Sequence, residues 1–128
     1  LDMITEDYVS FETAKLLKER GFECEKNSTT AMYNELGVFL PLSTAAEELY
    51  RDYNDFDEYD YIAPTLQMAM KWLREKHKMF IRVIQSHIAY CTCEIYYEMV
   101  KYYNFRESFA SYEEACEAAI KYCLENLI

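Results

Sequence analysis

The sequence predicts a single domain of the α+β class over residues 1–128, with an antiparallel sheet and three main helices. Apolar residues recur at helical spacing in three segments, and another segment alternates apolar and polar residues as a half-buried strand does. The chain has only two glycines and two prolines, which argues against a turn-rich all-β fold. A chain of 128 residues can bury a real core. A three-layer α/β/α sandwich is one arrangement of these elements.

The first predicted helix spans residues 10–21. Ser10 is a natural N-cap, because its hydroxyl can accept a hydrogen bond from an early helical N–H. Phe11, Ala14 and Leu17 share one face, and charged residues take the other positions. Gly21 suits the left-handed position that ends many helices.

The region that follows carries weaker signals. Residues 22–33 favour an extended form, and residues 37–42 predict an edge strand because they are apolar and include Pro41. Residues 43–50 predict a short helix. Residues 51–61 hold five acids and one arginine without an apolar period, which indicates a surface loop or an edge segment.

The second helix is predicted to begin near Pro64, which fits a first helical turn, with Thr65 as a competing cap. Its apolar stripe comprises Leu66, Ala69, Met70, Leu73 and His77. We expect it to end near His77 or Lys78. Residues 79–85 then predict a strand from their isoleucine and valine content.

Residues 86–89 predict a hairpin connection to a second strand at residues 90–99. One face of that strand would carry Cys91, Cys93, Ile95, Tyr97 and Met99. The other would carry Tyr90, Thr92, Glu94, Tyr96 and Glu98. This strict alternation predicts one buried and one outer face.

The last helix has the clearest start signal. Ser111 and Glu114 form a capping box, in which the hydroxyl accepts from the Glu114 amide and the carboxylate accepts from the cap amide. The apolar stripe that follows comprises Tyr112, Ala115, Cys116, Ala119, Ile120, Cys123, Leu124 and Leu127. Its length predicts a helix with one continuous buried face.

Charge restricts the classes of partner. Thirteen basic residues stand against 23 acidic ones, for a formal charge of −10. This balance opposes direct binding to nucleic acid or to anionic membranes, and it suits a basic protein partner. No run of about 18 apolar residues is present, so we expect no membrane span.

Five cysteines and an acidic beginning without an export pattern predict free thiols in the cytoplasm. The chain begins with Leu1, which the sequence leaves unexplained. Cys91 and Cys93, with His87 nearby, could suggest zinc, but structural zinc sites usually use cysteines spaced two to four apart. We expect core cysteines, with no disulfide, metal or cofactor.

No catalytic motif is visible. The acidic segment fails as a calcium loop, because Tyr59, Asp60 and Leu66 occupy positions that need an acid, a glycine and a glutamate. There is no nucleophile elbow, glycine-rich phosphate loop or HExxH motif. Catalytic groups can also be assembled from distant parts of a chain, so an enzyme stays an alternative.

The 13 tyrosines are the most unusual count, and tyrosine is enriched at protein interfaces. The plain explanation is that tyrosine favours strands. The candidate partner-binding residues are Tyr53, Asp55, Asp57, Tyr59, Tyr90 and Tyr96. They lie in the acidic segment and on the outer face of the strand at residues 90–99.

Three blocks carry a resemblance: "TEDYVSFETAKLLKERGF", "APTLQMAMKWLRE" and "SYEEACEAAIKYCLENL". They resemble blocks that recur in small uncharacterised proteins of gut bacteria and their phages. The layout of helix, two-strand unit and alanine-rich last helix resembles the phage ABA sandwich domain. The blocks cover under half of the chain. The resemblance implies helices on both faces of a sheet and a phage or prophage setting, and it transfers no catalytic residue.

These observations lead to one expected function and two alternatives. We expect a non-enzymatic accessory protein of phage or prophage type that binds another protein. The alternatives are a small enzyme whose site forms only in space and an acidic decoy of nucleic acid. The sequence leaves a homo-oligomer open and identifies no partner.

Overall fold

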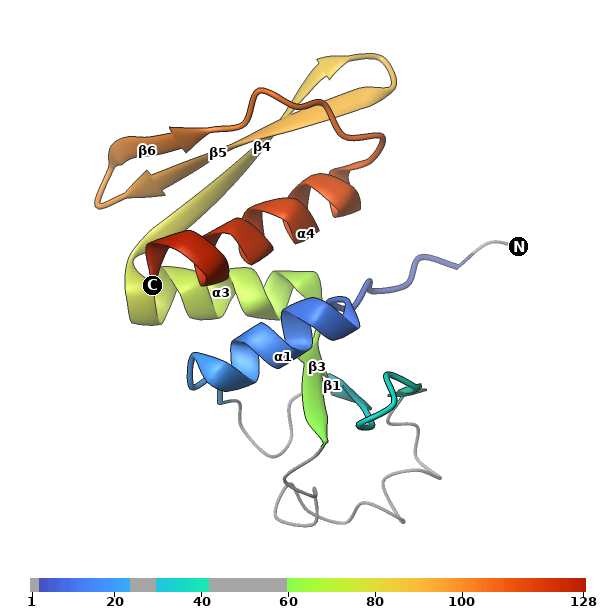
Figure 1. The fold of residues 1–128 in the computed structure, drawn as a ribbon. Helices are drawn as coiled ribbons and strands as arrows, with labels where there is room; N and C mark the ends of the chain where they lie inside the picture. Colours follow the sequence, from blue (N-terminus) through green and yellow to red (C-terminus); the bar gives the residue numbers. More distant parts are fainter. Residues whose placement is uncertain (1–2, 24–29, 42–59) are drawn as a thin grey trace. The chain divides into compact units, whose positions relative to one another are not determined.

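The computed structural model describes residues 3–23, 30–41 and 60–128 (Figure 1). The chain divides into two compact units, Leu1–Thr65 and Leu66–Ile128. The single domain expected over 1–128 stays a prediction, because this division describes compactness along the chain and not independent folding.

Helix α1 of the first unit spans Phe11–Glu19, as predicted. The Ser10 side chain caps it by accepting a hydrogen bond from the Thr13 amide at 3.3 Å. Ala14 and Leu17 are fully buried on its inner face. Gly21 follows with a φ of +81°, the left-handed conformation that its position predicts.

The first unit also holds a three-stranded antiparallel sheet of order β2-β1-β3. Its strands are β1 (Thr30–Tyr33), β2 (Phe39–Pro41) and β3 (Tyr61–Pro64). The edge strand expected near Pro41 is confirmed as β2, and α1 packs on β3. The short helix predicted at residues 43–50 lies outside the described residues.

Of the two predicted positions for the start of the second helix, Pro64 is wrong, whereas Thr65 directly precedes the helix. Pro64 is the last residue of β3, and its carbonyl accepts a hydrogen bond from the Val9 amide at 3.0 Å. Helix α3 begins two residues later, at Leu66. Proline is tolerated here because β3 is an edge strand, where a missing N–H costs little.

An aromatic cluster joins the elements of the first unit. Phe11 of α1 contacts Tyr33 of β1 and Tyr61 of β3, with ring centroids 5.4 and 5.6 Å apart. Tyr33 also contacts Phe39 of β2 at 5.4 Å. Tyr61 ends the segment predicted to be a surface loop or an edge segment, and it begins the edge strand β3. It is half-buried and helps to hold helix and sheet together.

The second unit has the order α3-β4-β5-β6-α4. Its elements are α3 (Leu66–His77), β4 (Met79–His87), β5 (Tyr90–Tyr97), β6 (Val100–Asn104), α4 (Tyr112–Tyr122) and a π-helical turn η2 (Cys123–Leu127). The strands form an antiparallel sheet of order β4-β5-β6. Helix α4 packs on β4 and β5, and α3 packs against β4 and α4, on the same side of the sheet (Figure 1).

The core of the second unit follows the predicted stripes except at Tyr112, which is 43% exposed. Helix α3 buries Leu66, Ala69, Met70, Trp72 and Leu73. Helix α4 and its π-helical turn bury Ala115, Cys116, Ala119, Ile120, Cys123 and Leu124. Ser111 caps α4 as predicted, accepting from the Glu114 amide at 3.1 Å. The Glu114 carboxylate accepts from Ala110, one residue before the cap amide that the capping box predicted.

The end of β5 departs from the prediction. The strand stops at Tyr97, and Glu98 and Met99 form a turn in which both residues have positive φ, 47° and 71°. Met99, expected on the buried face, is 93% exposed. The chain then returns as β6, which the sequence did not predict, because this turn lacks the Asn-Gly signature of such hairpins.

The described residues therefore form a mixed α+β fold with three α-helices, as predicted, but with two small antiparallel sheets in place of one. Within the second unit, α3 and α4 pack on one side of its sheet. The three-layer sandwich stays a prediction.

Candidate functional site

The outer face of the second sheet mixes aromatic and charged side chains. The antiparallel register places Phe80 beside Tyr96 and Arg82 beside Glu94. Phe80 lies on the outer face of β4 and is 46% exposed. This face turns away from α4, because the residues of β5 that alternate with it, Cys93 and Ile95, are fully buried on the opposite face.

Glu94 is the centre of a charge cluster on this face. Its carboxylate lies 2.8 Å from the Lys101 ammonium of β6 and 3.7 Å from the Arg82 guanidinium of β4. The residue is only 8% exposed, because neighbouring side chains on the sheet cover it. The hydrogen bond from Lys101 holds the pKa of Glu94 below its usual range, and the charges of Lys101 and Arg82 act in the same direction.

This cluster ties three strands together. The hydrogen bond to Glu94 in turn raises the pKa of Lys101, so both groups are charged at neutral pH. Arg82 keeps 65% of its side chain exposed, and its contact with Glu94 is the longer one. Arg82 can therefore accept a further anionic partner from outside the chain.

Two predicted partner-binding residues, Tyr90 and Tyr96, lie in β5 on this outer face. Tyr90 begins the strand and is 51% exposed, whereas Tyr96 is half-buried near its end. They are six residue steps apart in extended chain, a separation of roughly 20 Å. They therefore lie at opposite ends of the sheet and do not form a single binding site.

The other four predicted partner-binding residues, Tyr53, Asp55, Asp57 and Tyr59, lie outside the described residues. They stay predictions from the sequence.

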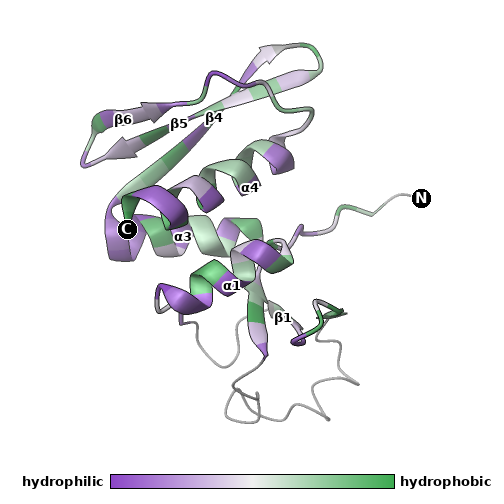
Figure 2. Ribbon diagram, in the orientation of Figure 1, coloured by the Kyte–Doolittle hydropathy of each residue, from purple (hydrophilic) through white to green (hydrophobic). Residues whose placement is uncertain are grey.

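The β5–β6 turn carries an exposed apolar group that the sequence did not reveal. We call Tyr97, Met99, Val100 and Tyr102 the turn surface. Met99 and Val100 are 93% and 68% exposed, and the start of β6 is among the hydrophobic parts of the ribbon in Figure 2. The missed signal is the alternation itself, which continues through Met99 and hides the turn.

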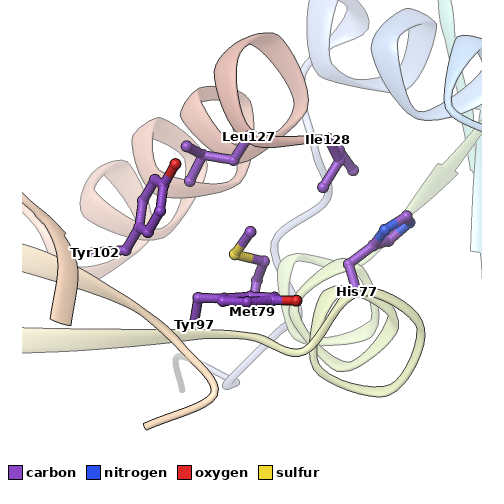
Figure 3. A pocket seen from close by; sticks show the side chains of 6 residues that line it. All are labelled: His77, Met79, Tyr97, Tyr102, Leu127 and Ile128. Atoms are coloured by element: carbon purple, nitrogen blue, oxygen red, sulfur yellow. The ribbon is translucent and has the colours of Figure 1, made fainter. Parts of the chain in front are cut away.

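A shallow pocket of about 480 Å³ adjoins the turn surface. Its lining residues are His77, Met79, Tyr97, Tyr102, Leu127 and Ile128. Figure 3 shows Met79 in the middle of the lining side chains beside Tyr97, with Leu127 and Ile128 across from Tyr97 and with Tyr102 and His77 at the two sides. The lining side chains are apolar apart from one imidazole and two hydroxyls, and none of them carries a carboxylate or a thiol. Such a lining suits an apolar side chain better than acid–base chemistry.

Four described cysteines are free thiols in or beside the core. Burial raises the pKa of Cys93 and Cys123 to about 12 and that of Cys116 to about 11. Protonated, buried thiols are poor nucleophiles and poor metal ligands. Within residues 3–23, 30–41 and 60–128, no three His, Cys, Asp or Glu side chains gather as a metal site would require.

Charge is divided sharply between the two units. Residues 1–65 contain fifteen acidic and five basic residues, whereas residues 66–128 contain eight of each. The formal charge of −10 therefore belongs entirely to the first unit. Among the helices that the structure describes, none has the length and apolar character that crossing a bilayer needs.

Searches among protein families, curated proteins and solved structures find nothing that matches this chain.

Proposed function

We propose that this chain is a non-enzymatic accessory protein of phage or prophage type that acts in the cytoplasm by binding another protein. The observation that carries the proposal is the turn surface. Met99 and Val100 are among the most exposed large apolar residues of the second unit, and the other two members of the turn surface, Tyr97 and Tyr102, line an open apolar pocket. Clustered exposed apolar residues are typical of binding surfaces.

Other observations support parts of this proposal. The described cysteines are free thiols, which suits a reducing compartment. The phage or prophage setting is supported by the resemblance of the three sequence blocks. The acidic segment with Tyr53, Asp55, Asp57 and Tyr59 is a second proposed contributor to partner binding, because interfaces favour tyrosine and rim charges speed encounter.

The test is affinity capture from a host-cell lysate, with mass spectrometry of the captured proteins. The double variant Met99→Ser/Val100→Thr should lose a partner that the parent chain recovers. Ile88→Ser is the matched control, since Ile88 is 97% exposed in the turn at the other end of β5. Recovery of the same proteins by all three chains would contradict a role of the turn surface.

The tyrosines of the acidic segment need a separate variant. Tyr53→Ser/Tyr59→Ser should abolish recovery of the same partner while circular dichroism reports an unchanged fold. Full recovery by the folded variant would remove the acidic segment from the proposal and leave the turn surface in place.

An acidic decoy of nucleic acid is the second candidate. The concentration of the whole net charge in residues 1–65 favours it, because a decoy needs closely spaced carboxylates. A decoy would capture a basic nucleic-acid-binding protein, and added duplex DNA would displace that protein. A partner that stays bound in the presence of DNA would argue against the decoy.

A further inference from the structure

The second unit has a long strand edge that is not paired with another described strand, the outer edge of β4. β4 is an edge strand in the sheet order β4-β5-β6, and no other described strand pairs with its outer side. It spans 9 residues and pairs with β5 in regular register from Met79 to Gln85, whereas the opposite edge strand, β6, spans 5 residues and its pairing with β5 contains a register shift. A long edge presents a row of unpaired backbone N–H and C=O groups.

The side chains of β4 show that this edge is incompletely covered. Ile81 and Val83 point to the inner face, yet both are half-buried, whereas Ile95 and Cys93, their partners in register, are fully buried. Adding another strand beside this edge would bury more of these apolar side chains, and that burial is favourable.

The charge around β4 points to the chemistry of the added strand. From residue 76 to residue 93 the sequence contains Lys76, Lys78 and Arg82 and not one acid, in a chain whose formal charge is −10. Arg82 lies in the middle of β4 with 65% of its side chain exposed, and the Glu94 carboxylate beside it already has a closer partner in Lys101. An acidic residue opposite Arg82 would form a favourable cross-strand pair.

We propose that the free edge of β4 binds an extended segment of a partner protein by strand addition, and that this segment carries an Asp or Glu opposite Arg82. The inference rests on the proposed protein-binding function and gives the chemistry of its partner. Backbone hydrogen bonds supply the affinity in this mode of recognition, and alternate side chains supply the specificity.

Two other occupants fit less well. A second copy of this chain would bring β4 against β4, and neither strand carries an acid to neutralise the two copies of Arg82. Single-stranded nucleic acid would need several cations along its path. On the outer face, Glu94 neutralises Lys101 and leaves Arg82 as the remaining cation of this cluster.

The test uses the full chain and labelled synthetic peptides in fluorescence anisotropy. The probe is as long as β4, 9 residues, alternates valine and threonine, and carries one central glutamate. The control probe carries lysine in place of glutamate. We expect the Kd of the lysine probe to be about tenfold higher, because it replaces an attractive cross-strand pair with a repulsive one.

Two further measurements separate strand addition from simple charge attraction. Arg82→Glu should reverse the preference between the probes, whereas Lys71→Glu, the same charge change at an exposed position of α3, should leave it unchanged. Arg82→Gln should abolish the preference, and it keeps the test valid if Arg82→Glu does not fold. Two further probes are N-methylated, one at its odd-numbered residues and one at its even-numbered residues. Only one of these two methylation phases should block binding, since only one set of amides faces β4.

Four results would overturn the inference. They are no binding of the glutamate probe, equal effects of both N-methylation phases, a dimer that forms through β4 in sedimentation experiments, and displacement of the probe by oligouridylate. The proposed function would fail differently. If the turn-surface variant loses its captured partner while Arg82→Glu keeps it, the chain binds protein but not through β4.

Discussion

At the scale of single residues, the two glycines share one conformation and differ in their surroundings. Both have a φ of +81°, which costs other L-residues roughly 1–2 kcal/mol. A Cβ on Gly21 would meet nothing within 4 Å, whereas a Cβ on Gly37 would lie 3.0 Å from the Phe11 ring. Gly37 therefore has a steric reason to be glycine that Gly21 lacks.

This difference predicts unequal losses of stability. Gly21→Ala should lower the free energy of unfolding by roughly 1–2 kcal/mol, and Gly37→Ala should lower it further, because Phe11 must also move out of the aromatic cluster. Urea denaturation of both variants measures the difference. Equal losses would mean that the Phe11 ring yields without cost.

Glu94 predicts how stability depends on acid. Its pKa is lower in the folded chain than the ordinary value of 4.5, so ionised Glu94 stabilises the fold fully above that value. The contribution is lost as the pH falls through the lower, folded pKa. Glu94→Gln should therefore flatten the acid side of the stability profile in urea titrations below pH 4.5. Glu98→Gln, in the exposed β5–β6 turn, should keep the slope of the parent chain, and a parental slope in Glu94→Gln would contradict the assignment.

At the scale of elements, the segment from α3 into β4 builds the core. Leu73 is fully buried on the face that packs toward β4 and α4, whereas Lys71 is exposed. Leu73→Ala should cost about 2–5 kcal/mol of unfolding free energy, as truncations of buried leucine do. Lys71→Ala should cost less than about 0.5 kcal/mol. Chemical denaturation compares the two, and equal small losses would show that the buried face of α3 is misassigned.

The sequence predicted best the helices that begin with a capping side chain. Ser10 and Ser111 mark two helix starts by side-chain capping, which needs no knowledge of the rest of the fold. β3 was missed because Pro64 fits a helix start as well as the end of an edge strand, and only pairing with β1 decides between them. β6 was missed because Glu98 and Met99 adopt positive φ without a glycine.

The candidate site was less predictable than the fold. Alternation correctly placed Tyr90 and Tyr96 on the outer face of β5, but it assigned Met99 to the core. The near-complete burial of Glu94 was also unexpected, because it depends on Lys101 in a strand that the sequence did not reveal. Long-range partners of this kind arise from the sheet register, and no short pattern encodes them.

At the scale of the whole molecule, the two units differ in the kind of partner that they suit. The first holds all of the net negative charge, and the second is formally neutral with a basic stretch at β4. Long-range attraction to a basic protein would come from residues 1–65, whereas apolar and backbone contacts come from residues 66–128. The rate of association with a partner and the lifetime of the complex are thus expected to depend on different parts of the chain.

Reversal of charge in the acidic segment tests this division. Asp55→Lys/Asp57→Lys should slow association with the captured partner and weaken its dependence on salt, because rim charges steer encounter more than they set affinity. Glu107→Lys/Glu113→Lys changes the net charge equally, at exposed positions of the second unit outside the turn surface, and is the matched control. If net charge alone governed encounter, both pairs would slow association to the same extent. The measurement is the association rate at several salt concentrations. A larger effect of the Asp55 and Asp57 changes would locate the steering in the acidic segment. An unchanged rate in both variants would exclude electrostatic steering by that segment.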